Sequence, residues 1–213
     1  MINLLDALLV IVLAMNLFAL GTSRILSVIR IVGTQGALIG IIPLLMHEHL
    51  TIPSILASLA AIVLKGIVIP NIMIKALRDA QIKREIEPLI GFLPSILLGA
   101  AATAFSLLMS NHLAVTAQAA SSLIISTSIA SVLIGFIILT TRVKALSQVL
   151  GYLVLENGIY IFSLLLVEAI PLVVEMGMLL DLFVTVFVIS IITNHINQAF
   201  SSMDTRRLSS LKE

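Results

Sequence analysis

The sequence lacks the residues on which several common protein chemistries depend. None of its 213 residues is a cysteine or a tryptophan, and only 11% are charged. Without cysteine, the chain itself has no disulfide, no cysteine nucleophile and no thiolate ligand for an iron–sulfur cluster. The low share of charged residues is far below the roughly 25% of an ordinary soluble domain.

Apolar residues take the place of the missing charges. They make up 60% of the chain, and the mean hydropathy is +1.20. This composition predicts an integral membrane protein. The first residues contain Asp6 and no Lys or Arg, whereas a secretory signal begins with basic residues. The N-terminal segment is therefore predicted to be a retained membrane span.

Long apolar runs separated by short polar breaks give the expected fold. A membrane-spanning helix needs about 20 mainly apolar residues. The fold class expected is all-α, a polytopic membrane bundle of about seven transmembrane helices forming a single membrane domain over residues 1–213. The seven expected spans are 3–22, 26–46, 52–75, 89–109, 113–141, 146–168 and 173–198.

The basic residues predict the orientation of the chain. Eleven of the twelve Lys and Arg residues fall in or beside every second loop, or in the tail: Arg24, Arg30, Lys75, Arg78, Lys83, Arg84, Arg142, Lys144, Arg206, Arg207 and Lys212. Cytoplasmic loops are enriched in Lys and Arg. We therefore expect the N-terminus outside, the C-terminus cytoplasmic, and a multi-pass location in a bacterial or archaeal cytoplasmic membrane with lipids around it.

Three ionisable residues lie deep inside the predicted spans, away from their ends. Lys65 falls near the middle of the third span, Glu156 near the middle of the sixth and Asp181 in the middle third of the seventh. One charged side chain at a helix centre costs about 2.5–3.5 kcal/mol on insertion scales. Such residues are typical of ion or proton pathways, although static structural ion pairs are an alternative explanation.

A polar stripe surrounds Glu156 on the sixth span. Gln148, Tyr152, Glu156 and Tyr160 recur every four residues, which places them on one helix face, with Ser163 three residues further on. Such a stripe is expected to order water along a path. Desolvation favours the neutral form of a carboxyl group, and a nearby ammonium favours the charged form. Movement of Lys65 could therefore control proton uptake by a carboxylate.

Small and helix-breaking residues mark two further features. Pro70, five residues after Lys65 and following Gly66, cannot donate a backbone hydrogen bond, so we expect an irregularity in the third span. Gly33, Gly36 and Gly40 predict a close-packing seam on the second span. The Ser- and Thr-rich fifth span is expected to lie inside the bundle, with its hydroxyls bonded to its own backbone or to neighbouring helices.

The sequence contains none of the motifs that bind nucleotides, metals or nucleic acids. It has no Walker loop, GxGxxG fingerprint, serine elbow or HExxH pair. The histidines of "HEHL" are only two positions apart. We therefore expect no cofactor, no metal, no nucleic-acid partner and no catalytic residue in this chain.

The C-terminal half resembles a known family. The runs "GYLVLENG" and "VEMG", the acidic seventh span and the ending "DTRRLSSLKE" resemble component E of hydrogenase-4, a membrane subunit of formate hydrogenlyase-type complexes. The last three spans are in turn similar to subunit K of bacterial complex I and to the C subunit of multisubunit cation/proton antiporters. On this basis 1–111 is a four-helix extension, 112–200 a subunit K-like part and 201–213 a cytoplasmic tail.

The resemblance implies a non-catalytic subunit rather than a lone enzyme. Its partners would be antiporter-like and other membrane subunits, and through them a peripheral hydrogenase- or dehydrogenase-like arm carrying the redox centres. Glu156 and Asp181 match the positions of the two glutamates essential for proton movement in subunit K, the second as Asp. Lys65 inherits no role from subunit K.

Two hypotheses of different class follow. In the first, the chain contributes to a proton path, with Glu156 as the central carrier and Asp181 as the second station. Tyr152, Tyr160 and Gln148 would order water, and Lys65 would tune the electrostatic field. In the second, the chain is a scaffold that fastens antiporter-like subunits together, and its buried charges are static. A freestanding transporter is less favoured, because the sequence shows no internal repeat.

Overall fold

The computed structural model describes residues 4–46, 52–79, 86, 88–113, 122–165 and 183. These residues are almost entirely helical, which confirms the all-α prediction for the described part of the chain. Six of the helices there are long and apolar enough to cross a membrane. The protein is therefore a multi-pass helical membrane protein. The predicted span 173–198, which contains Asp181, and the tail 201–213 lie outside the described residues, apart from Phe183.

The observed helices follow the predicted spans closely. Five of them correspond to one predicted span each, and the third predicted span is a column of α3, η1 and α4, named here the α3–α4 column. The bounds are α1 Leu4–Gly21, α2 Ile25–Met46, α3 Ile52–Val63, η1 Leu64–Val68, α4 Ile69–Asp79, α5 Phe92–Leu113, α6 Ser122–Thr141 and α7 Ala145–Ser163.

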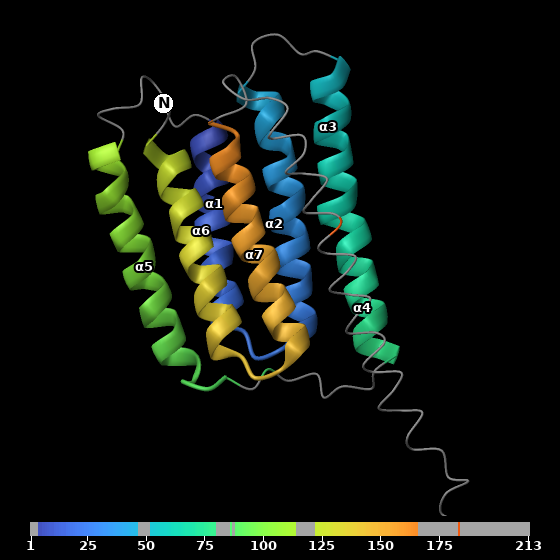
Figure 1. Cartoon of the computed structure of the whole chain (residues 1–213), viewed down its shortest axis with the longest axis vertical. Helices are drawn as coiled ribbons and strands as arrows, with labels where there is room; N and C mark the ends of the chain where they lie inside the picture. Colours follow the sequence, from blue (N-terminus) through green and yellow to red (C-terminus); the bar gives the residue numbers. More distant parts are fainter. Residues whose placement is uncertain are drawn as a thin grey trace, which may run out of the picture.

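The helices stand side by side as an upright bundle (Figure 1). α1, α2, α6 and α7 form its centre, α5 packs outside α1 and α6, and the α3–α4 column packs along α2. α7 is the most buried of these spans, with 72% of its 18-residue apolar stretch inside the protein. Any side chain pointing from α7 toward a neighbouring helix is therefore shielded from both lipid and water.

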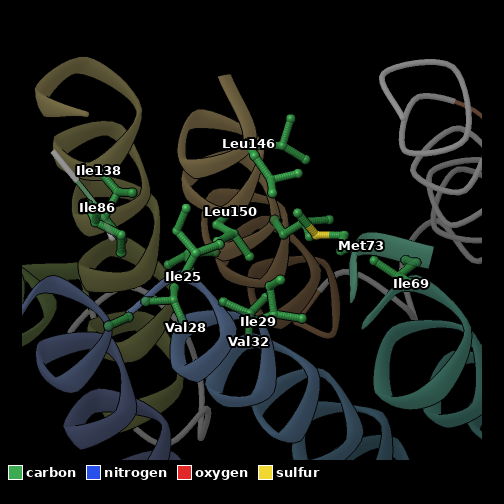
Figure 2. Packing of buried hydrophobic residues seen from close by; sticks show 14 of the residues in the cluster. Ile25, Val28, Ile29, Val32, Ile69, Met73, Ile86, Ile138, Leu146 and Leu150 are labelled. Atoms are coloured by element: carbon green, nitrogen blue, oxygen red, sulfur yellow. The ribbon is translucent and has the colours of Figure 1, made fainter. Parts of the chain in front are cut away.

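The centre of the bundle is filled by aliphatic side chains from several helices. Figure 2 shows one cluster in which Ile25, Val28, Ile29 and Val32 of α2 face Leu146 and Leu150 of α7, while Met73 and Ile69 approach from α4. A second cluster fills the other half of the bundle. It includes Leu9 and Val12 of α1, Ile39 and Ile42 of α2, and Tyr160 and Ile161 of α7.

The connections that carry basic residues meet at one end of the bundle. Ile86 donates its backbone N–H to Ser23 O at 2.7 Å, and Leu89 donates to Thr141 O at 2.9 Å. Arg24, Lys144 and the last turn of α4 with Arg78 lie at this end, the lower one in Figure 1. We call it the basic end; the other is the opposite end.

Arg142 has a structural role that the sequence analysis did not predict. Counted there only as a loop charge, its side chain is buried in the basic end, with 1% of the residue exposed. Its Nη2 donates to Leu20 O at 2.8 Å, its Nη1 to Ser95 Oγ at 3.3 Å, and the guanidinium lies 5.5 Å from the Phe92 ring centroid. The guanidinium therefore caps the C-terminus of α1, where helix carbonyls lack partners. Burial lowers the pKa of this group from its ordinary value.

Candidate functional site

The candidate site begins with an irregular turn in the α3–α4 column. Residues Leu64–Val68 form a π-helix, and the backbone N–H of Ile69 donates to Leu64 O, five residues back. Pro70 follows directly and has no N–H to give to an α-helical ladder. The irregularity expected near Pro70 is thus a π-turn, a feature often found at functional sites, and Lys65 is its second residue.

The predicted glycine seam holds this turn against α2. A Cβ on Gly36 would lie 2.7 Å from Cβ of Lys65, one on Gly33 would lie 2.5 Å from Cγ of Pro70, and one on Gly40 would lie 2.7 Å from Cγ1 of Ile62. Only glycine permits such a close approach of the two backbones. The seam prediction is confirmed, and its consequence is that α2 fixes the position of Lys65.

Close packing against α6 fixes α7 in a similar way. A Cβ on Gly135 of α6 would lie 2.5 Å from the backbone nitrogen of Leu155, and one on Gly158 of α7 would lie 2.7 Å from that of Val132. The two backbones are therefore nearly in contact on both sides of residue 156 along α7. With this helix fixed, Glu156 reaches the α3–α4 column.

Lys65 and Glu156 form a direct ion pair. Nζ of Lys65 lies 2.5 Å from Oε1 of Glu156, and 11% and 3% of the two side chains are exposed. The sequence placed both residues near the middle of their spans, and the structure brings them into contact across 91 positions of sequence. Because a buried unpaired ion is far costlier than a paired one, each residue stabilises the charge of the other.

Tyr160 adds an aromatic ring on one side of the pair. Its ring centroid lies 5.2 Å from Nζ of Lys65, within the range of a cation–π interaction. The residue is buried, and it lies one turn beyond Glu156 toward the opposite end. Of the predicted polar stripe, Glu156 and Tyr160 therefore meet Lys65.

The other members of the predicted stripe have contacts outside the ion pair. Gln148 is eight residues from Glu156, a rise of about 12 Å along the helix, and its Nε2 donates to Arg142 O at 3.1 Å. Tyr152 is half-buried and packs against the first aliphatic cluster. Ser163 donates to Tyr160 O within its own helix. Asp181 falls outside the described residues. A water-ordering role for Tyr152 and Gln148 stays a prediction.

A chain of buried amides next to the ion pair was missed by the sequence analysis. Asn157 Nδ2 donates to Gln35 Oε1 at 3.2 Å, Gln35 Nε2 to Asn16 Oδ1 at 2.8 Å, and Asn16 Nδ2 to Ser131 Oγ at 2.8 Å. All four residues are at most 3% exposed. This amide chain links α7, α2, α1 and α6. The signal for it was an uncharged amide deep inside each of three apolar spans, which a search for charges overlooks.

The predicted environment of the fifth span is confirmed by its hydroxyls. Ser128 Oγ donates to Ile125 O in its own helix at 2.8 Å, and Ser126 Oγ donates to Ser110 Oγ of α5 at 2.6 Å.

Among the described residues, no three His, Asp or Glu side chains lie close enough together to hold a metal ion. The chemistry available in the described site is therefore that of one carboxylate, one ammonium and one phenol.

Buried charge inside an apolar bundle defines the class of protein: a multi-pass membrane protein with an intramembrane ion pair. The chain is 30% identical over 189 residues to the uncharacterized protein Rv0085 of Mycobacterium tuberculosis, covering 88% of this chain and 86% of that protein. It belongs to the same family as Rv0085. No protein-family profile matches the chain, and no solved structure matches it.

Proposed function

We propose that the chain is a non-catalytic subunit of a proton-translocating membrane complex and that Glu156 is its central proton carrier. The observation that carries this proposal is the Lys65–Glu156 ion pair, buried in the middle of two apolar spans. Intramembrane ionisable residues that pair with one another commonly mark ion and proton pathways.

The ion pair can act as a two-state switch. With Glu156 ionised, the ammonium of Lys65 binds its carboxylate; when Glu156 takes up a proton, that attraction is lost and Lys65 keeps the Tyr160 ring as a partner. Lys65 lies on the π-turn, and the close packing of this turn against Gly36 of α2 fixes the backbone from which its side chain extends. Proton uptake at one atom would thus change the force between α7 and the α3–α4 column.

The resemblance to component E of hydrogenase-4 supplies the proposed setting. In that setting the chain has its N-terminus outside and its C-terminus in the cytoplasm. It lies between antiporter-like subunits and a redox-active peripheral arm that holds the metal centres. Asp181 would be the second proton station. These assignments rest on the resemblance of residues 140–213 and on the distribution of basic residues, not on the relative in M. tuberculosis.

A scaffold is the alternative function, and the amide chain favours it. The hydrogen bonds from Asn157 through Gln35 and Asn16 to Ser131 join four helices without any group that titrates near neutral pH. If the Lys65–Glu156 pair were one more static link of this kind, the chain would hold its neighbours together and carry no proton.

Proton pumping by membrane vesicles that contain the intact complex with Glu156→Gln separates the two functions. Gln preserves size and much of the hydrogen bonding but cannot be ionised. We expect normal assembly and loss of pumping. Asp6→Asn is the matched control, because Asp6 lies in the first turn of α1, away from the pair. Normal pumping by Glu156→Gln would reject the proton-carrier role, and loss of assembly would support the scaffold.

A further inference from the structure

A small pocket adjoins the ion pair. Its polar wall is made by Lys65, Glu156 and Asn157, and the remaining lining is aliphatic or backbone from α2, α4 and α7. The volume open to the centre of a water molecule is about 10 Å³. Since one water needs about 10–15 Å³ by this measure and 2–4 polar partners, the pocket suits a single water molecule.

Apart from Asn157, which directly follows Glu156 on α7, the lining of the pocket beyond the ion pair lies on one side of it. On α7 its lining residues Leu150 and Leu153 precede Glu156, on α2 Val32 precedes the contact of Gly36 with Lys65, and on α4 Met73 follows Lys65. α2 and α7 begin at the basic end and α4 finishes there, so each of these residues is displaced from the pair toward the basic end (Figure 1). Figure 2 shows Val32, Met73 and Leu150 converging from these three helices.

The other side of the ion pair is closed by apolar packing. Tyr160 lies against Nζ of Lys65 there, and it belongs to the second cluster with Ile39, Ala61 and Ile161. These four residues are at most 7% exposed. A water chain on that side would have to displace close-packed side chains at the ion pair itself. On the basic side the pocket provides space and polar partners next to the pair, and the close-packed residues of the first cluster, Met73 among them, lie beyond it.

We infer that the pocket is a water-binding site through which Glu156 exchanges protons with the basic end of the bundle, and not with the opposite end. This inference rests on the proposed function of Glu156 and adds the end of the bundle from which Glu156 receives its proton. Met73, an unbranched and flexible side chain, forms part of the pocket wall toward the basic end and is suited to move aside as water enters.

Single cysteines test this inference directly, because the chain has none of its own. Leu153→Cys places a thiol in the pocket wall, and Val154→Cys is the matched control, one residue further on the same helix, fully buried and not part of the lining. Val143→Cys, in the exposed loop before α7, reports which bulk phase faces the basic end. Silver ion is applied to one side of sealed vesicles containing the full complex, and unreacted thiols are then labelled with a maleimide after denaturation.

The expected result is that Leu153→Cys loses its maleimide labelling when silver is on the same side as Val143→Cys, while Val154→Cys keeps its labelling from both sides. Met73→Cys, from the facing wall on α4, should behave like Leu153→Cys and serves if that variant fails to accumulate. Protection only from the opposite side, from both sides or from neither side would overturn the inference. Labelling needs no transport, so its outcome is independent of the pumping test of Glu156→Gln. If the pocket cysteine is protected from one side and the Glu156→Gln complex pumps normally, the proton-carrier role is rejected but the hydrated pocket is not.

Discussion

Glu156 and Asn157 are neighbours in the sequence, both are buried, and they face different partners. Glu156 reaches the α3–α4 column, where it meets the titratable Lys65 on a π-turn. Asn157 reaches α2, where it joins a chain of amides that neither gain nor lose protons near neutral pH. The comparison separates two uses of polarity inside a membrane bundle: the carboxyl group of Glu156 is of a kind that can bind a proton, whereas the amide of Asn157 can only form hydrogen bonds, to Gln35 and at the pocket.

The largest expected effect on stability comes from removing one partner of the ion pair. Lys65→Met leaves the Glu156 carboxylate buried without its ammonium partner, a change that typically costs about 3–5 kcal/mol. We expect a lower melting temperature and a reduced level of the complex. Adding Glu156→Leu removes the second charge, so stability should recover in the double variant while proton pumping stays absent. Recovery of pumping together with stability would show that the pair is only structural.

A smaller effect is expected from moving Lys65 without changing its charge. Gly36→Ala puts a methyl group 2.7 Å from Cβ of Lys65, and overpacking of this kind costs about 1–3 kcal/mol. Gly40→Ala, one turn along the same seam, crowds Ile62 by the same distance and is the control. Both variants should melt lower, but only Gly36→Ala should also slow pumping by each assembled complex. Equal pumping rates in the two variants would mean that the position of Lys65 is not critical.

The smallest effect is expected on the amide side. Ser131→Ala removes the acceptor of Asn16 Nδ2, and hydrogen bonds between membrane helices are worth about 0.6–2 kcal/mol. Ser128→Ala is the control, since the Ser128 hydroxyl donates to Ile125 O of its own helix. Thermal melting should detect the loss in Ser131→Ala, with pumping per assembled complex unchanged. A pumping defect equal to that of Gly36→Ala would remove the distinction between the two sides of α7.

Features that rest on one element could be predicted from the sequence. The helices follow from the apolar runs, and the packing seam follows from Gly33, Gly36 and Gly40. Lys65 and Glu156 were conspicuous because a charge in an apolar span is costly wherever its partner lies. Each of these predictions needed only local composition and helical spacing.

Features that depend on which helices are neighbours could not be predicted in the same way. The contact between Lys65 and Glu156 joins α7 to a column 91 residues earlier in the chain, and nothing in the spacing of either span encodes it. The amide chain requires four helices to meet at one level. Arg142 is similar. Its place between two apolar runs predicts a loop charge, but its role depends on the end of α1, 122 residues away.

The central claim, that Glu156 takes up and releases a proton, is tested most directly by infrared difference spectroscopy of the intact complex in membranes. The carbonyl stretch of a protonated carboxyl group is followed while turnover is started, in the wild type, in Glu156→Gln and in the control Asp6→Asn. Our account predicts a carboxyl band that changes on turnover in the wild type and in Asp6→Asn and is missing in Glu156→Gln. A band that persists unchanged in Glu156→Gln would contradict it.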